Sequence, residues 1–236
     1  MRGKIFRQDV QMFAFFGFML LAFFYLSYTK TLGSEWQINS IVLFLILAGM
    51  LVLSATEIPI YRIRTKKPDF SDEKNELLSE FYSVPVAEEI ETDSELVFDS
   101  SITLNVGGFI LPLILAAYVA INETIKCPIF ASLEILLIIV VVTHLLTEFK
   151  SGIGIVIPDY IGLVAIPFAL ILEPENAASI VLVSGVFGIL VGIITSLFNI
   201  NENTEGSAFI NLGGVSNFRA IYITVLIASL LTYAPV

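Results

Sequence analysis

The chain has 236 residues, of which 56% are hydrophobic and 14% are charged, and its formal net charge is −10. Soluble domains carry charge on about a quarter of their residues, so this composition excludes an ordinary soluble fold and indicates an integral membrane protein. No segment is basic enough to form a nucleic-acid-binding surface. The single cysteine, Cys127, excludes an intramolecular disulfide bond.

Long apolar runs predict seven transmembrane segments, because about 18 or more apolar residues can cross a bilayer as a helix. The segments lie near residues 10–29, 38–60, 105–121, 129–148, 152–172, 176–199 and 217–235. The first run is longer than the apolar part of a signal peptide and is expected to be retained. Gly and Pro interrupt some of the segments. We therefore expect an all-α polytopic membrane helix bundle that forms one domain over residues 1–236.

The basic residues are distributed unequally between the two sides of this bundle. Lys30 and Lys126 fall on one side, and the other ten Lys and Arg fall on the side of the N-terminus. These ten are Arg2, Lys4, Arg7, Arg62, Arg64, Lys66, Lys67, Lys74, Lys150 and Arg219. Because cytoplasmic loops are enriched in Lys and Arg, we expect a cell-membrane protein with a cytoplasmic N-terminus and an external C-terminus.

Residues 61–104 form the only sizeable polar segment. Between Asp69 and Asp99 there are eleven Asp or Glu residues and one Lys. The flanks, "FYSVPV" and "ELVFDSSITL", are rich in β-branched and aromatic residues, which favour strands. We expect a small acidic cytoplasmic loop or hairpin with a solvated surface. The alternative is that the acidic residues bind a cation or a partner.

Three of the predicted helices begin with glycine. Asn105, Gly107 and Gly108 open the third segment, Gly152 and Gly154 open the fifth, and Asn211, Gly213 and Gly214 precede the seventh. The first N–H groups of a helix have no partner within the helix, and glycine allows close approach to them. Interrupted helices of this kind form substrate sites in transporters. The alternative is that these residues are ordinary caps and packing positions.

Asp159 lies about eight residues inside its predicted segment, roughly 12 Å deep if the chain is helical. A carboxylate at this depth must face the protein interior or a water-filled cavity. Pro158 removes a backbone donor and breaks the helix beside it. We therefore predict that Asp159 faces the interior near a break made by Gly154 and Pro158, as part of an ion or solute site. The alternative is that Asp159 caps a helix beginning after Pro158.

His144 and Glu148 are four residues apart and share one helix face, so they are further candidates for this site. The chain has a single His, so we expect no metal centre and no cofactor. The sequence contains no second intramembrane Asp and no nucleophile or phosphate-loop motif. Ser184, Gly188 and Gly192 recur every four residues, a spacing that favours close helix packing and could also support oligomerisation.

Five stretches taken together resemble a known family. They are "TEIPIYRI", "ITLNVGGFILPLILAAYV", "GIGIVIP", "VSGVFGILVG" and "INLGGVSNFRAIYITVLIASLL". In this order, over about residues 50–232, they resemble a bacterial and archaeal integral membrane family, domain of unknown function family 1614. The resemblance implies a multi-pass membrane protein with no established activity. It also implies an Asp after Gly192 and an acidic residue at position 219, where this chain has Ile193 and Arg219.

The leading functional hypothesis is that this membrane protein binds or transports a small solute or ion through a polar site open to the cytoplasm. Asp159 supplies the ionisable group in this hypothesis, and the glycine-led helix starts supply N–H groups. One alternative is an intramembrane enzyme that uses Asp159 with His144 and Glu148. Another is a non-catalytic scaffold in the lipid bilayer whose acidic loop recruits a partner.

Overall fold

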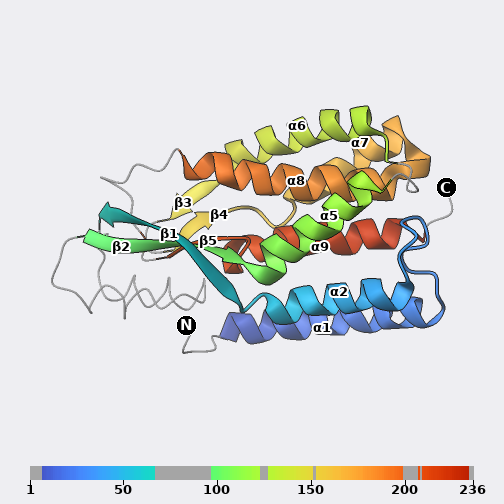
Figure 1. Cartoon of the computed structure of the whole chain (residues 1–236), viewed down its shortest axis with the longest axis horizontal. Helices are drawn as coiled ribbons and strands as arrows, with labels where there is room; N and C mark the ends of the chain where they lie inside the picture. The colour runs from blue at the N-terminus through green and yellow to red at the C-terminus, as the bar shows by residue number, and fades with distance from the viewer. Residues whose placement is uncertain are drawn as a thin grey trace.

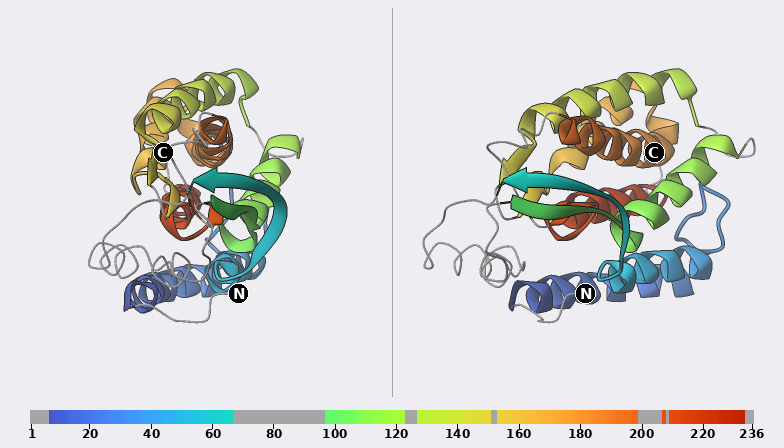
Figure 2. Two further views of the ribbon diagram at one scale, coloured as in Figure 1. Left: turned by 90° about the vertical axis from the view of Figure 1, so that its left-hand side faces the viewer. Right: turned by 60° about the vertical axis from the view of Figure 1, so that its left-hand side comes forward.

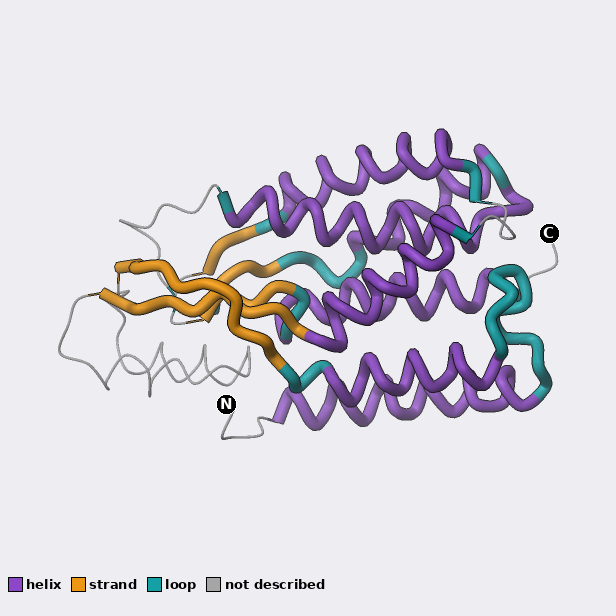
Figure 3. The backbone as a smooth tube through the Cα atoms, in the orientation of Figure 1, coloured by secondary structure: helices purple, strands orange, loops and turns teal. Residues whose placement is uncertain are grey.

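A computed structural model of the chain describes residues 7–66, 97–122, 127–150, 153–198, 207 and 209–233. In these residues the helices run side by side along the long axis, and the strands gather at one end, called here the sheet end (Figures 1 and 3). The α-helices are α1 (Arg7–Tyr28), α2 (Ser40–Leu53), α5 (Leu111–Ile121), α6 (Ile129–Leu146), α7 (Ala165–Leu172), α8 (Ala177–Leu197) and α9 (Val215–Leu231).

Helix α8 is the centre of the bundle. It packs against α5, α6, α7 and α9, and 83% of its apolar span is buried. Glycine and serine on α8 let its neighbours approach closely, because small side chains bring helix backbones together. The corresponding buried share of both α1 and α6 is 22%, so these two helices lie at the outside of the bundle.

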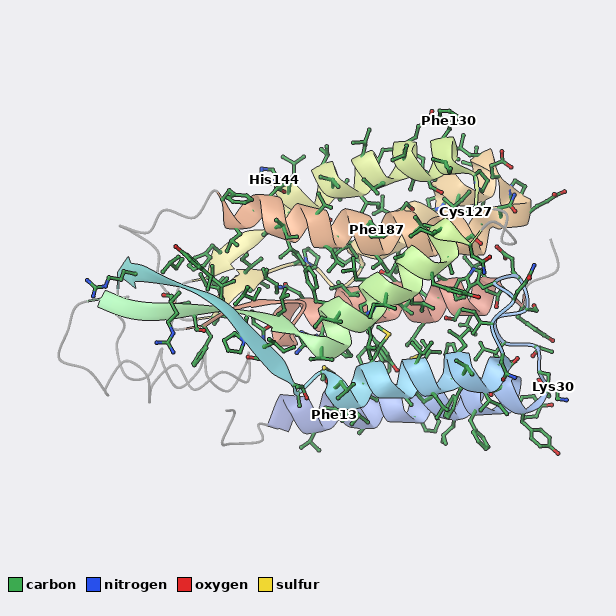
Figure 4. All side chains as sticks on the ribbon, in the orientation of Figure 1. Phe13, Lys30, Cys127, Phe130, His144 and Phe187 are labelled. Carbon is green, nitrogen blue, oxygen red and sulfur yellow. The ribbon has the colours of Figure 1, made fainter. Side chains whose placement is uncertain are left out.

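The outer helices present large apolar side chains to their surroundings. On α1 these include Phe15, Phe18 and Phe24, and on α6 they include Phe130 and Leu137. Phe130 points away from the bundle (Figure 4). Soluble monomers rarely expose apolar faces of this extent, whereas such faces suit contact with lipid. The arrangement is consistent with a membrane protein.

Three helical spans are long and apolar enough to cross a membrane: Val10–Tyr28, Ile129–Leu146 and Pro174–Leu197. They match the predicted first, fourth and sixth segments. The other apolar helices in the described residues are shorter, at 10–17 residues: Ser40–Leu53, Val106–Ile121, Ile161–Leu172 and Asn217–Leu231. The mainly helical class is therefore confirmed, but the count of seven transmembrane segments is not.

The largest difference from the sequence prediction is at residues 152–172. The described part of this segment begins as strand β4 (Gly154–Val156), continues without helix to residue 160, and then forms the 3-10 helix η2 (Ile161–Val164) and α7. Ile153, Ile155 and Ile157 are buried beneath the helices. Their hydropathy therefore reflects burial in the protein core, not a continuous transmembrane helix.

The described residues contain two sheets, so the all-α prediction is wrong. In the first sheet, β2 (Val97–Asn105) lies between β1 (Glu57–Lys66), which is antiparallel to it, and β5 (Phe209–Leu212), which is parallel to it. In the second, β3 (Glu148–Lys150) pairs antiparallel with β4. Figure 2 shows β1 and β2 side by side at the sheet end. The strand expected within residues 95–104 matches β2, but its partner β1 begins inside the segment that was predicted to cross the membrane at 38–60. The other expected strand, at residues 81–86, and most of the acidic residues lie outside the described residues.

At the opposite end, the loop between α1 and α2 joins the helix ends. The Glu35 carboxylate accepts hydrogen bonds from the backbone N–H and the hydroxyl of Ser179, at 3.3 and 2.7 Å. It therefore caps the first turn of α8 from another part of the chain. Burial raises the pKa of Glu35, and the two hydrogen bonds from Ser179 oppose this rise. The adjacent Trp36 is fully buried, so the loop is part of the core.

Candidate functional site

The two Asn-x-Gly-Gly motifs come together at the sheet end of the bundle. The first follows β2 and the second follows β5, and these strands are parallel neighbours. An added Cβ on Gly108 would lie 1.9 Å from the carbonyl oxygen of Gly213, so the two backbones touch. Gly213 has a φ of +75°, which favours glycine. The similarity of the motifs thus corresponds to a physical contact between them.

Asn105 and Gly107 fix the start of the first of these helices. The Asn105 side chain accepts a hydrogen bond from the Gly108 N–H at 2.8 Å and donates one to the Ser54 carbonyl at 2.6 Å. It caps the π-helical turn η1 (Val106–Ile110), which leads into α5. An added Cβ on Gly107 would lie 2.1 Å from the Met50 carbonyl oxygen. These glycines therefore serve close packing, and the Gly108 N–H is occupied by the chain itself.

A polar group lies where the first sheet meets α9. The side-chain amide of Asn211 donates to the Glu57 carboxylate, and the Thr103 hydroxyl donates to the same carboxylate at 3.4 Å. The Asn217 amide donates to the backbone carbonyl of Asn211 at 3.2 Å. An added Cβ on Gly214 would overlap the Asn211 amide, so glycine at this position leaves room for it. We call Glu57, Asn211 and Asn217 the junction cluster.

Of the two glycines that open the fifth predicted segment, the structure describes one. Gly154 lies in β4 with a φ of +97°, and an added Cβ would lie 3.1 Å from the Phe209 carbonyl oxygen of β5. It therefore brings the second sheet close to the first. Gly152 lies outside the described residues.

Asp159 pairs with Arg219. The Asp159 Oδ1 atom lies 3.5 Å from the Arg219 Nε atom, and the side chains are 41% and 39% exposed. Asp159 lies in the turn between β4 and η2, and Arg219 lies in the second turn of α9, a helix that is otherwise largely apolar. The sequence predicted a break within a helix, whereas the chain here forms β4 and then a turn before η2. The carboxylate is half-buried beside a cation, and it does not cap η2.

The surroundings of Asp159 make its carboxyl group a weaker acid than a free aspartic acid. Burial raises the pKa of the Asp159 carboxyl, and the Arg219 guanidinium opposes this rise. The folded chain therefore binds the proton more tightly than the unfolded chain does. It follows that ionisation of Asp159 disfavours folding. This cost decreases as the pH falls through the pKa of the folded state and is absent below the pKa of the unfolded state.

His144 and Glu148 contact other residues. The His144 Nδ1 atom lies 3.4 Å from the hydroxyl oxygens of Thr195 and Ser196 on α8. Glu148 pairs with Lys150 at 3.5 Å. His144 lies at the sheet end of α6 (Figure 4). His144, Glu148 and Asp159 thus lie at the same end of the bundle. The ion-pair partner of Asp159, however, is a residue of α9 and not His144 or Glu148.

The stripe of small residues on α8 faces α6 of the same chain. An added Cβ on Gly188 would lie 2.6 Å from Ile139, and one on Gly192 would lie 2.5 Å from Thr143. The Ser184 hydroxyl donates to the Ile180 carbonyl within α8. The stripe therefore has a packing role inside the chain, and its use in oligomerisation stays a prediction.

Three residues of these polar groups were not among the predicted site residues: Glu57, Asn217 and Arg219. Glu57 falls at the end of a predicted apolar segment and Asn217 at the start of another, where polar residues are common. Arg219 was assigned to the positive side of the membrane. An available signal was the position of Arg219 within an apolar run, since such cations usually have a partner.

Comparisons with known proteins assign the chain to a family, but they do not assign it an activity. A family model described as a protein of unknown function (DUF1614) matches residues 51–231. The searches of curated proteins and of solved structures found no match. The match covers η1 and every described strand and runs to the end of α9, so it includes both Asn-x-Gly-Gly motifs, the junction cluster and the Asp159–Arg219 pair. On this match, the chain belongs to the DUF1614 family of proteins of unknown function.

Proposed function

We propose that this chain is a membrane protein that binds a small polar solute or ion at the sheet end of its bundle. The supporting observation is the Asp159–Arg219 pair, in which Asp159 lies in the non-helical stretch between β4 and η2. Asp159 is the ionisable group that the sequence predicted for this site, and Arg219 is its partner. The pair offers a carboxylate for a cation or an amine and a guanidinium for a carboxylate or a phosphate.

The contribution of this ion pair to the stability of the fold is too small to explain its presence. A half-exposed ion pair contributes about 0–1 kcal/mol, so little is gained by placing two charges beside an apolar bundle. Charged residues in such segments commonly mark ion or substrate sites. Both side chains are partly accessible, so an incoming ligand can replace one partner of the pair without unfolding the chain.

Ligand screening of the purified protein tests this proposal. At constant Na⁺ and K⁺, the melting temperature should rise saturably with at least one compound in a panel of small carboxylates, phosphates, amino acids, amines and divalent cations. The Arg219→Gln variant should lose the response to an anionic ligand, and Asp159→Asn should lose the response to a cationic one. Arg64→Gln is the matched control, because Arg64 is an exposed arginine on β1. No response in the wild type, or an unchanged response in both variants, would contradict the proposal.

The proposed site also requires that the sheet end faces the cytoplasm. Among the described basic residues, Arg62, Arg64 and Lys150 lie on the strands, whereas Lys30 lies at the other end (Figure 4). This distribution supports a cytoplasmic sheet end. In a Cys127→Ser background, Lys30→Cys should react with a membrane-impermeant maleimide added to intact cells. Arg64→Cys should react only after permeabilisation, and the reverse pattern would contradict this orientation.

A further inference from the structure

We propose that the junction cluster binds an alkali-metal cation through oxygen atoms of Glu57, Asn211 and Asn217. This site is separate from the Asp159–Arg219 pair, and its existence does not depend on a ligand at that pair. The three residues come from β1, β5 and the first turn of α9, so the site can form only where the sheet and the helix meet.

Two buried amide oxygens are available to bind a cation. Asn217 is fully buried, with an exposed fraction of 0%. Within the described residues, neither its Oδ1 atom nor that of Asn211 has a hydrogen-bond donor. Buried polar oxygens almost always have a partner, and an unfilled one costs free energy. A cation bound in the cluster would supply the partner that these oxygens lack.

Rotating the amides does not remove this problem. The Asn211 nitrogen already donates to the Glu57 carboxylate, and the Asn217 nitrogen donates to the Asn211 carbonyl. If the nitrogen and oxygen of the Asn211 amide were exchanged, its oxygen would face the Glu57 carboxylate. The same exchange in Asn217 would make its oxygen face the Asn211 carbonyl. Both contacts would join two hydrogen-bond acceptors. The hydrogen bonds therefore fix which end of each amide is the oxygen.

The types of ligand atom determine the class of cation. Carboxylate and amide oxygens are hard ligands, which suit alkali and alkaline-earth cations rather than zinc or copper. No group of three or more His, Cys, Asp or Glu residues capable of holding a metal occurs in the described part of the chain. The cluster supplies one carboxylate and two neutral amides, and a ligand set with so few carboxylates suits a monovalent cation better than a divalent one.

Neighbouring residues fix the positions of the Asn211 amide and the Glu57 carboxylate. The Asn211 amide lies against the backbone of Gly214, where an added Cβ would be 2.1 Å from its side-chain carbon. Thr103 donates a hydrogen bond to the second oxygen of Glu57. Gly214 and Thr103 thus hold the amide and the carboxylate in place, which favours a preformed site over a mobile surface group.

Melting temperatures in different salts test the inference. The purified full-length protein is compared in NaCl, KCl and N-methyl-D-glucamine chloride at the same ionic strength and pH. We expect a saturable increase of about 5 °C in NaCl or KCl over N-methyl-D-glucamine chloride, as for a ligand present at about 100 times its dissociation constant. An increase with divalent cations only, or no difference between the salts, would overturn the proposal.

Two variants locate the effect. Glu57→Gln should abolish the response to alkali cations, whereas Asp159→Asn should retain it, because Asp159 belongs to the other site. Loss of the response in Asp159→Asn with retention in Glu57→Gln would overturn the assignment to the junction cluster. If Glu57→Gln does not fold, we measure the binding of radioactive ²²Na⁺ to the wild type, with and without competing KCl. Absence of saturable binding overturns the proposal. A melting temperature that depends on pH but not on alkali cations also overturns it.

Discussion

Gly108→Ala is expected to destabilise the folded chain by about 4 kcal/mol, among the largest effects of any single substitution. The added methyl group would lie 1.9 Å from the carbonyl oxygen of Gly213 and 2.9 Å from the ring of Phe218. The first contact is with the backbone, so no change of side-chain rotamer relieves it. The start of α5 must therefore separate from the β5–α9 turn. The variant should show a large decrease in melting temperature in detergent.

Gly17→Ala is the matched control for this experiment. Gly17 lies on α1, and an added Cβ would have no atom within 4 Å. Alanine also has the higher helix propensity, so this variant should melt at the wild-type temperature or above it. If Gly108→Ala melts like Gly17→Ala, the two Asn-x-Gly-Gly motifs are not in the close contact described above.

Gly185→Ala is expected to destabilise the chain by about 2–3 kcal/mol, and Thr224→Ser is expected to restore much of this loss. An added Cβ on Gly185 of α8 would lie 2.6 Å from the Cγ2 methyl group of Thr224 on α9. The other atom within 4 Å is the Gly162 carbonyl oxygen, at an ordinary distance of 3.9 Å. Serine lacks the methyl group but keeps the hydroxyl that donates to the Ala220 carbonyl.

A double-mutant cycle measures this rescue. The double variant Gly185→Ala/Thr224→Ser should be more stable than the sum of the single effects, by about 1–2 kcal/mol. Gly188→Ala is the control, because its added Cβ would meet Ile139 of α6 instead. Thr224→Ser should not rescue Gly188→Ala. Equal effects of Thr224→Ser in both backgrounds would show that α8 and α9 are not packed through this contact.

The sequence predicted the long helices well because their apolar runs are uninterrupted. The expected segment 129–148 is α6 (Ile129–Leu146), and the expected segment 176–199 is α8 (Ala177–Leu197). The prediction was wrong at 152–172, because hydropathy does not distinguish a residue that faces lipid from one buried in a strand. Ile155 is buried beneath helices and belongs to β4. The Gly-Ile alternation before Pro158 was the available signal for extended structure.

The polar groups were less predictable than the helices because their partners are distant in sequence. Asp159 stands out in the sequence as a charge within an apolar stretch, but its partner Arg219 lies 60 residues further along the chain. Glu57 and Asn211 are separated by 154 residues. Local patterns identify which residues are unusual in an apolar chain. The pairing between them depends on strand register, and a single sequence does not show the register of β2 with β5.

The parallel pairing of β2 with β5 also determines when the sheet end can assemble during synthesis. Ser101 pairs with Phe209, so more than one hundred residues, including α5 to α8, must be made between the two strands. Chains emerge from the ribosome N-terminus first, and contacts between distant residues form late. Until residues 209–231 are available, Gly108 has no Gly213 to contact and Asp159 has no Arg219. The polar end of this bundle is therefore completed by α9, after the long apolar helices that precede it have been made.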